Sequence, residues 1–115
     1  MSADSVAKQK GMAFAVRIVR LYQFLTKEKQ EYVLSKQILR SGTSIGANIA
    51  EAIYGSSRKD FVSKLYIALK ETAETLYWLE LLYQCDYIPS RLYQSLARDC
   101  EELRKILSSS TKSTA

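Results

Sequence analysis

Apolar residues recur every three or four positions along most of the chain, which is the period of an amphipathic α-helix. The clearest such stretch runs from Gln37 to Glu74 and predicts a long helix, a tight turn and the first half of another helix. The first of these two helices carries its aliphatic residues on one face, namely Leu34, Ile38, Ile45, Ile49 and Ile53. Because such a face must be covered by other helices, the pattern predicts a helical bundle built around this segment.

The same periodicity predicts four helices, at about residues 10–26, 31–54, 58–84 and 89–107, followed by a polar tail over residues 108–115. Gly55, a Ser57–Asp60 pair typical of a helix start, and Pro89 indicate two of the turns. We place the remaining turn at residues 27–31, because one straight helix through both segments would require a coiled coil and the apolar repeat does not keep strict heptads. Amphipathic helices with short connections favour a single all-α domain over residues 1–115, folded as an antiparallel up-down-up-down four-helix bundle.

Small residues follow the apolar face of the predicted second helix. Gly42, Gly46 and Ala50 are spaced four apart, so they lie along one line of that helix. Glycine has no Cβ, and we therefore expect another helix to approach closely along this line.

The predicted third helix has apolar residues on two faces. Its second strip contains Ile67, Trp78 and Leu81, beside the face that would join the core. Since a monomeric bundle covers one face of each helix, this strip predicts self-association. The alternative is that Trp78 packs against the end of the first helix.

The composition of the sequence argues against several classes of function. No run of about 18 apolar residues exists and the N-terminus lacks the apolar core of a signal peptide, so we expect a cytoplasmic protein with no membrane partner. The sequence has no histidine, and its two cysteines lack metal-type spacing. It therefore offers no metal site, no histidine-dependent catalytic triad and no phosphate-binding loop. We expect no enzymatic activity, no cofactor and no small-molecule substrate.

Positive charge is concentrated in the first part of the chain. Residues 1–70 hold 12 lysines or arginines against 5 acids, whereas residues 71–115 hold 5 against 7. Such a surface can attract the phosphates of RNA or DNA, although it also fits an ordinary solvated face or an acidic partner. The candidate phosphate contacts are Lys10, Arg17, Arg20, Lys27, Lys36 and Arg40.

Several motifs resemble the 23S rRNA intervening-sequence protein family. They are Tyr32-x-Leu34, the run from Gln37 to Glu51 that ends in SIGANIAE, Phe61, Ile67-Ala68 and Ala73-Glu74. The resemblance covers most of the chain, with Ala52 where glycine is common and KETAETLYWLELL where many members carry a GSxxEL type of run.

The resemblance implies a bacterial four-helix bundle assembled as a ring-shaped homopentamer. The sequence is also similar to accessory proteins of diversity-generating retroelements, which are basic pentamers that bind nucleic acid and a reverse transcriptase. Asn48, Glu51 and Glu74 match the family motif, and we interpret them as a polar cluster between the second and third helices, with Arg40 or Arg58 as partner. The alternative is that they are exposed helix residues.

Together these patterns predict a non-enzymatic oligomeric bundle that binds RNA or DNA through a basic surface. The alternative is a structural oligomer or scaffold that binds a protein partner without nucleic acid.

Overall fold

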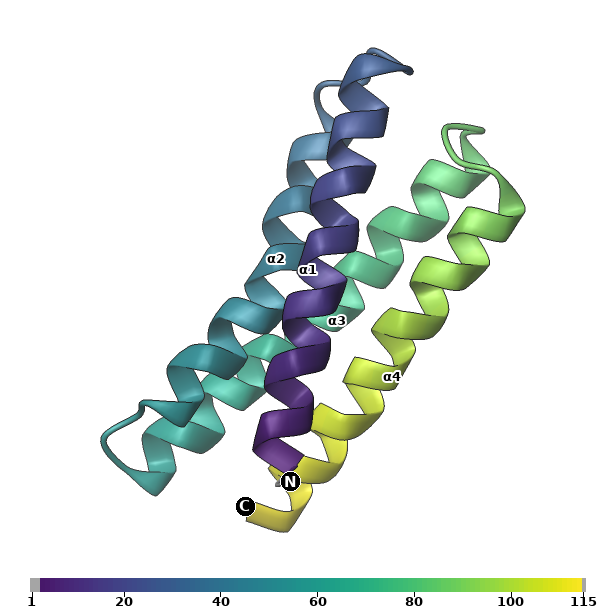
Figure 1. The fold of residues 1–115 in the computed structure, drawn as a ribbon. Helices are drawn as coiled ribbons and strands as arrows, with labels where there is room; N and C mark the ends of the chain where they lie inside the picture. Colours follow the sequence, from purple (N-terminus) through teal and green to yellow (C-terminus); the bar gives the residue numbers. More distant parts are fainter. Residues whose placement is uncertain (1–2, 115) are drawn as a thin grey trace.

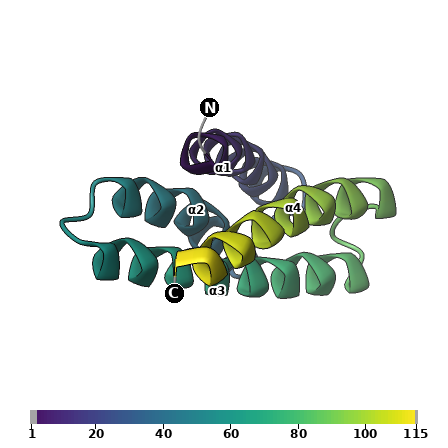
Figure 2. The ribbon, with the colours of Figure 1, turned by 90° about the horizontal axis from the view of Figure 1, so that it is seen from below.

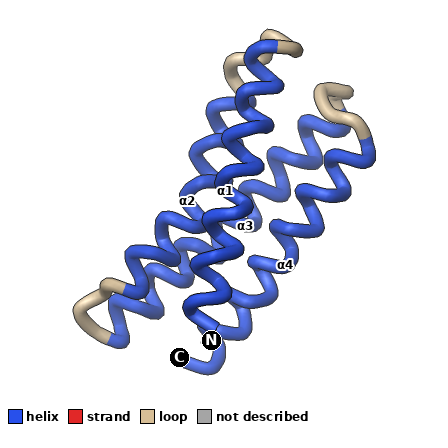
Figure 3. Tube along the Cα trace, in the orientation of Figure 1, coloured by secondary structure: helices blue, strands red, loops and turns tan. Residues whose placement is uncertain are grey.

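The computed structural model describes residues 3–114, which form four α-helices and no strand (Figures 1 and 3). The helices are α1 (Ala3–Lys27), α2 (Leu34–Ile53), α3 (Arg58–Gln84) and α4 (Ser90–Thr114). The predicted all-α fold is confirmed. None of these helices combines the length and the apolar character that a bilayer crossing requires.

The helices pack mainly against their neighbours in sequence. α2 lies along both α1 and α3, α3 lies along α4, and α1 and α4 touch over a shorter stretch. Figure 2, which shows the bundle from below, places α1 and α3 on opposite sides of the molecule. Two helices therefore turn an outer face in roughly opposite directions.

Both terminal helices are longer than the apolar pattern predicts. α1 begins at Ala3 rather than near residue 10, and α4 continues to Thr114 through the segment expected to be a polar tail. Both chain ends lie at the same end of the bundle (Figure 1). There Ala7 and Thr111 are almost fully buried, so these small residues extend the core stripes without adding a strong hydrophobic signal.

The start of α2 also differs from the prediction of about residue 31. Glu31 lies before the helix, and its carboxylate accepts hydrogen bonds from the backbone N–H groups of Val33, Leu34 and Ser35 at 3.2, 3.0 and 2.7 Å. Burial raises the pKa of Glu31, but these backbone donors outweigh it and hold the pKa below its usual value of 4.5. Glu31 therefore satisfies the unpaired donors at the start of α2 from outside the helix.

The close approach predicted for the glycines of α2 occurs between α1 and α2. A Cβ on Gly46 would lie 3.0 Å from backbone atoms of Gly11, and a Cβ on Gly42 would lie 2.7 Å from Ile18 Cγ1. On the same side of α2, Ile38, Ile45 and Ile49 are fully buried, whereas Leu34 is half-buried and Ile53 is partly exposed. The central part of the predicted stripe thus forms the core beneath α1.

Candidate nucleic-acid interface

Two of the six predicted phosphate contacts tie α1 to α4. Lys10 Nζ lies 3.1 Å from Glu102 Oε1, and Arg17 Nη1 lies 2.7 Å from Asp99 Oδ2. Arg17 Nη1 also donates a longer hydrogen bond of 3.5 Å to the carbonyl oxygen of Ser95. These cations already have acidic partners, which reduces the charge that they offer to a phosphate.

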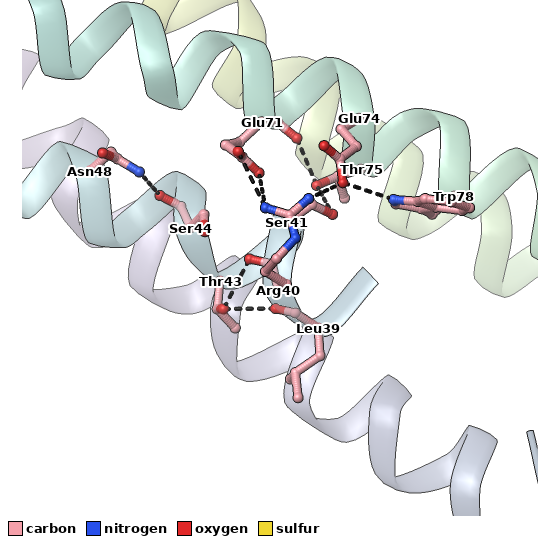
Figure 4. A network of polar contacts seen from close by, with 10 residues as sticks. All are labelled: Leu39, Arg40, Ser41, Thr43, Ser44, Asn48, Glu71, Glu74, Thr75 and Trp78. Atoms are coloured by element: carbon pink, nitrogen blue, oxygen red, sulfur yellow. Dashed lines mark hydrogen bonds and ion pairs between the residues drawn. The ribbon is translucent and has the colours of Figure 1, made fainter. Parts of the chain in front are cut away.

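Arg40, a third predicted phosphate contact, joins a polar network between α2 and α3 (Figure 4). Its guanidinium contacts Glu74 and lies 3.3 Å from Glu71 Oε2. Trp78 Nε1 donates to the same Glu74 carboxylate at 3.0 Å. The indole N–H and the guanidinium outweigh burial and hold the pKa of Glu74 below its usual value of 4.5. This network therefore favours an ionised Glu74 that anchors α3 against α2.

A second link between α2 and α3 lies beneath this network. Thr75 Oγ1 is 3.0 Å from Ser41 Oγ, and both side chains are fully buried. The sequence analysis did not select either residue, because a single serine or threonine within an apolar stripe resembles a small core residue. Glu71 was also omitted from the predicted cluster, although its spacing of three from Glu74 places both acids on neighbouring turns.

The structure does not bring the predicted polar cluster together. Of the three predicted residues, only Glu74 contacts Arg40, whereas Glu51 Oε1 lies 3.4 Å from Lys64 Nζ. Asn48 donates its amide hydrogen bond to the backbone of its own helix (Figure 4). The three residues therefore make separate contacts, and the prediction that they form one cluster is wrong. Glu74 pairs with Arg40, Glu51 pairs with Lys64, and Asn48 bonds only within α2.

The other three predicted contacts carry positive charge without an acidic partner. Arg20, Lys27 and Lys36 are exposed and form no ion pair with the side chains described between residues 6 and 112. Arg20 and Lys27 are seven residues apart on one side of α1, and Lys36 lies in the first turn of α2, which follows. Lys29 lies in the connection between α1 and α2, and its Nζ atom lies 5.8 Å from the centroid of the Phe24 ring. We call Arg20, Lys27, Lys29 and Lys36 the basic end.

The predicted oligomer surface on α3 is only partly exposed. Ile67 is 39% exposed, whereas Trp78 and Leu81 are half-buried. The same helix also exposes two tyrosines, Tyr66 and Tyr77, to 45% and 60%. We call the exposed residues Tyr66, Ile67 and Tyr77 the α3 face.

A second exposed apolar strip lies on α1 and was missed by the sequence analysis. Met12, Val16 and Val19 are 66%, 43% and 40% exposed, with spacings of four and three along one side of the helix. Beside Met12, a shallow groove of about 220 Å³ between α1 and α2 is lined largely by small residues of α2 such as Ala47 and Ala50. The helical spacing of these α1 residues was a readable signal, but it was not separated from the core stripe of the same helix. We call Met12, Val16 and Val19 the α1 strip.

Among the side chains described between residues 6 and 112, no group of histidine, cysteine, aspartate or glutamate is arranged to hold a metal ion.

The fold and these contacts define an all-α protein of four helices tied together by polar links. A family model described as the 23S rRNA-intervening sequence protein matches residues 3–109, and the chain belongs to that family. It is also similar to a crystal structure of a protein with unknown function from the S23 ribosomal protein family of Bacteroides thetaiotaomicron, with a TM-score of 0.95 and 57% identity over 96% of this chain and 99% of the other. No curated protein matches the sequence. The predicted family resemblance is confirmed, and the related structure's own description assigns no activity.

Proposed function

We propose that the protein is a cytoplasmic, non-enzymatic homo-oligomer, in the form of a pentamer, that binds RNA or DNA through its basic end. The observation that carries this proposal is that Arg20, Lys27 and Lys36 remain without acidic partners in the described structure, although other cations of α1 and α2 are paired. A lysine or arginine that neutralises a phosphate releases condensed counterions, and this release drives binding at low salt. Glu28, also exposed, lies in the same segment and reduces the net charge of the basic end without removing its excess.

This proposal gives the paired cations a different role from the predicted one. Lys10, Arg17 and Arg40 hold helices together. A phosphate would have to compete with the carboxylates of Glu102, Asp99 and Glu71, which lie 2.7–3.3 Å from these cations. Phosphate binding is therefore assigned to the basic end rather than to all six predicted residues.

Self-association would repeat the basic end around the assembly. Each protomer would be an antiparallel up-down-up-down bundle, consistent with the packing of each helix against its neighbours in sequence. The α1 strip and the α3 face lie on helices at opposite sides of the bundle (Figure 2), so a contact between them would be head-to-tail and could close into a ring. Several weak phosphate sites on one ring would then bind a long polyanion with much higher avidity than one site alone.

Charge reversal at the basic end tests nucleic-acid binding. A triple variant carries Arg20→Glu, Lys27→Glu and Lys36→Glu, and a control with the same change in charge carries Lys59→Glu, Lys70→Glu and Lys105→Glu at exposed positions elsewhere. Fluorescence polarisation with a labelled single strand should show binding weakened by at least about tenfold in the first variant and much less in the control. Equal weakening in both variants would mean that net charge, rather than the basic end, determines binding.

A scaffold that binds a protein partner is the second candidate function. The observation in its favour is the extent of exposed apolar surface, including Met12 at 66% and Tyr54 at 79%. A specific protein retained by the wild type from a nuclease-treated lysate, and lost with Tyr54→Glu, would favour this function. Retention of nucleic acid alone would favour the first.

A further inference from the structure

A groove between α1 and α4 lies next to the basic end. The two helices diverge toward the end of the bundle that carries the α1–α2 and α3–α4 connections (Figure 1). The groove has a volume of about 310 Å³, within the size range of small-ligand sites. Its lining consists of Arg17, Arg20, Leu21, Phe24, Leu92 and Leu96.

The groove combines an apolar floor with an aromatic wall. Leu21 and Leu96 are almost fully buried and form the floor, whereas Phe24 and Leu92 are half-buried and remain accessible at the sides. The Nζ atom of the exposed Lys29 lies 5.8 Å from the centroid of the Phe24 ring. That ring face is therefore reached from solvent by a flexible side chain, which an incoming planar group could displace.

Cations border the same groove on its α1 side. Arg20 forms no ion pair within residues 6–112, and Lys27 lies two turns further along α1. On the α4 side, the carboxylate of Asp99 is already neutralised by Arg17 at 2.7 Å, so it offers little repulsion to an approaching phosphate. An apolar slot with an aromatic wall beside cations is the combination with which proteins hold single-stranded nucleic acid, because bases stack on the ring while phosphates contact the cations.

We infer that this groove takes an unpaired base of single-stranded RNA or DNA, stacked against Phe24, while Arg20 and Lys27 hold the neighbouring phosphates. The inference rests on the proposed nucleic-acid binding and adds a preference to it. Bases inside a duplex are stacked and paired, so they would have to be flipped out before they could enter the groove. The protein should therefore prefer single strands over duplexes of the same length.

The test separates the base from the phosphates. Binding is measured by fluorescence polarisation for an oligothymidylate of about 20 nucleotides, longer than a typical single-strand site, and for a strand of equal length in which the thymines are replaced by abasic sites. Both strands carry the same phosphates. We expect the oligothymidylate to bind roughly 5- to 150-fold more tightly, as stacking of one base on an aromatic ring provides.

Two matched variants locate the effect. Phe24→Leu removes the ring and keeps an apolar side chain, so it should abolish most of the difference between the two strands and leave abasic binding unchanged. Tyr54→Leu removes an exposed ring at the end of α2, 79% exposed and outside the groove, and should preserve the difference. Circular dichroism checks the fold of both variants, and the wild-type comparison holds even if a variant misfolds.

Equal wild-type affinity for the two strands, with binding that still weakens in salt, would overturn the groove and leave the proposed function standing. Binding of neither strand would overturn both. A strand preference that survives Phe24→Leu in a folded variant would also overturn the assignment.

Discussion

Gly42 marks the place where α1 lies directly against α2, and its replacement with alanine tests that contact. A Cβ at this position would lie 2.7, 2.9 and 3.1 Å from the Cγ1, Cγ2 and Cδ1 atoms of Ile18. Carbon atoms in favourable contact are about 3.5–4.0 Å apart. Ile18 is fully buried and branched at Cβ, so its side chain is stiff at χ1 and cannot turn away into solvent.

Two opposing terms determine the effect of Gly42→Ala on the free energy of unfolding. Alanine favours a helix interior over glycine by about 1 kcal/mol, whereas overpacking a core costs about 1–3 kcal/mol. Because three atoms of Ile18 are too close, we take the upper part of that range and expect a net loss of about 1–2 kcal/mol. Ile18→Ala removes all three atoms, at a cost of about 2–5 kcal/mol of its own. In that background Gly42→Ala should stabilise the protein by up to about 1 kcal/mol.

Urea denaturation of the wild type, both single variants and the double variant measures this reversal of sign. All four proteins are compared at one protomer concentration, since self-association would make stability depend on concentration. The expected coupling between the two positions is about 2–3 kcal/mol. An identical effect of Gly42→Ala in both backgrounds would refute the contact, as would stabilisation of the wild type.

Three further predictions concern the cap, the cysteines and the assembly. Glu31→Ala should lower stability by about 1–2 kcal/mol at neutral pH. Because the pKa of Glu31 is lowered in the folded state, its contribution is present above pH 4.5 and is lost as the pH falls through the folded value. Urea midpoints of variant and wild type should therefore converge in acid, and a constant gap would count against the cap. Burial raises the pKa of the Cys100 thiol to about 12, whereas Cys85 is exposed. Mass spectrometry should therefore find that a thiol reagent at mildly alkaline pH labels only Cys85, and that it labels both cysteines in urea. Two adducts without urea would be inconsistent with the buried thiol. Met12→Glu in the α1 strip and Ile67→Glu in the α3 face should each give a monomer in light scattering. Their mixture should give a dimer, because the intact α3 face of the first variant can bind the intact α1 strip of the second. A mixture that stays monomeric would argue against head-to-tail contact.

Turn, helix-capping and glycine patterns in the sequence correctly predicted where α3 begins and where α2 meets another helix closely. α3 begins at Arg58, directly after Ser57, whose Oγ accepts a hydrogen bond from the backbone N–H of Asp60 at 3.1 Å, as the sequence pattern indicates. The reciprocal half of that motif is different, because the Asp60 carboxylate accepts from the Ser56 hydroxyl at 3.3 Å. The close approach at Gly42 was also predictable, since the absence of a side chain at a helix face is visible in the sequence.

Contacts that depend on which helix faces meet could not be predicted in the same way. Charge alone made Arg17 resemble Arg20, but only the packed structure places Asp99 beside it. For Glu74 the sequence left Arg40 and Arg58 open as partners, and only the packed structure shows that Arg40 is the one in contact. Likewise, a threonine in a polar segment gives no sign of burial, and only the packed structure shows that Thr111 is almost fully buried.

Whether the basic end contacts phosphates is measured most directly by the salt dependence of single-strand binding. The logarithm of the binding constant is plotted against the logarithm of salt concentration for the wild type and for the triple variant Arg20→Glu, Lys27→Glu, Lys36→Glu. Each lost phosphate contact reduces the slope by about 0.7 for a single strand, so we predict a slope shallower by about 2 in the variant. Equal slopes for the two proteins would contradict the assignment of phosphate binding to this end of the bundle.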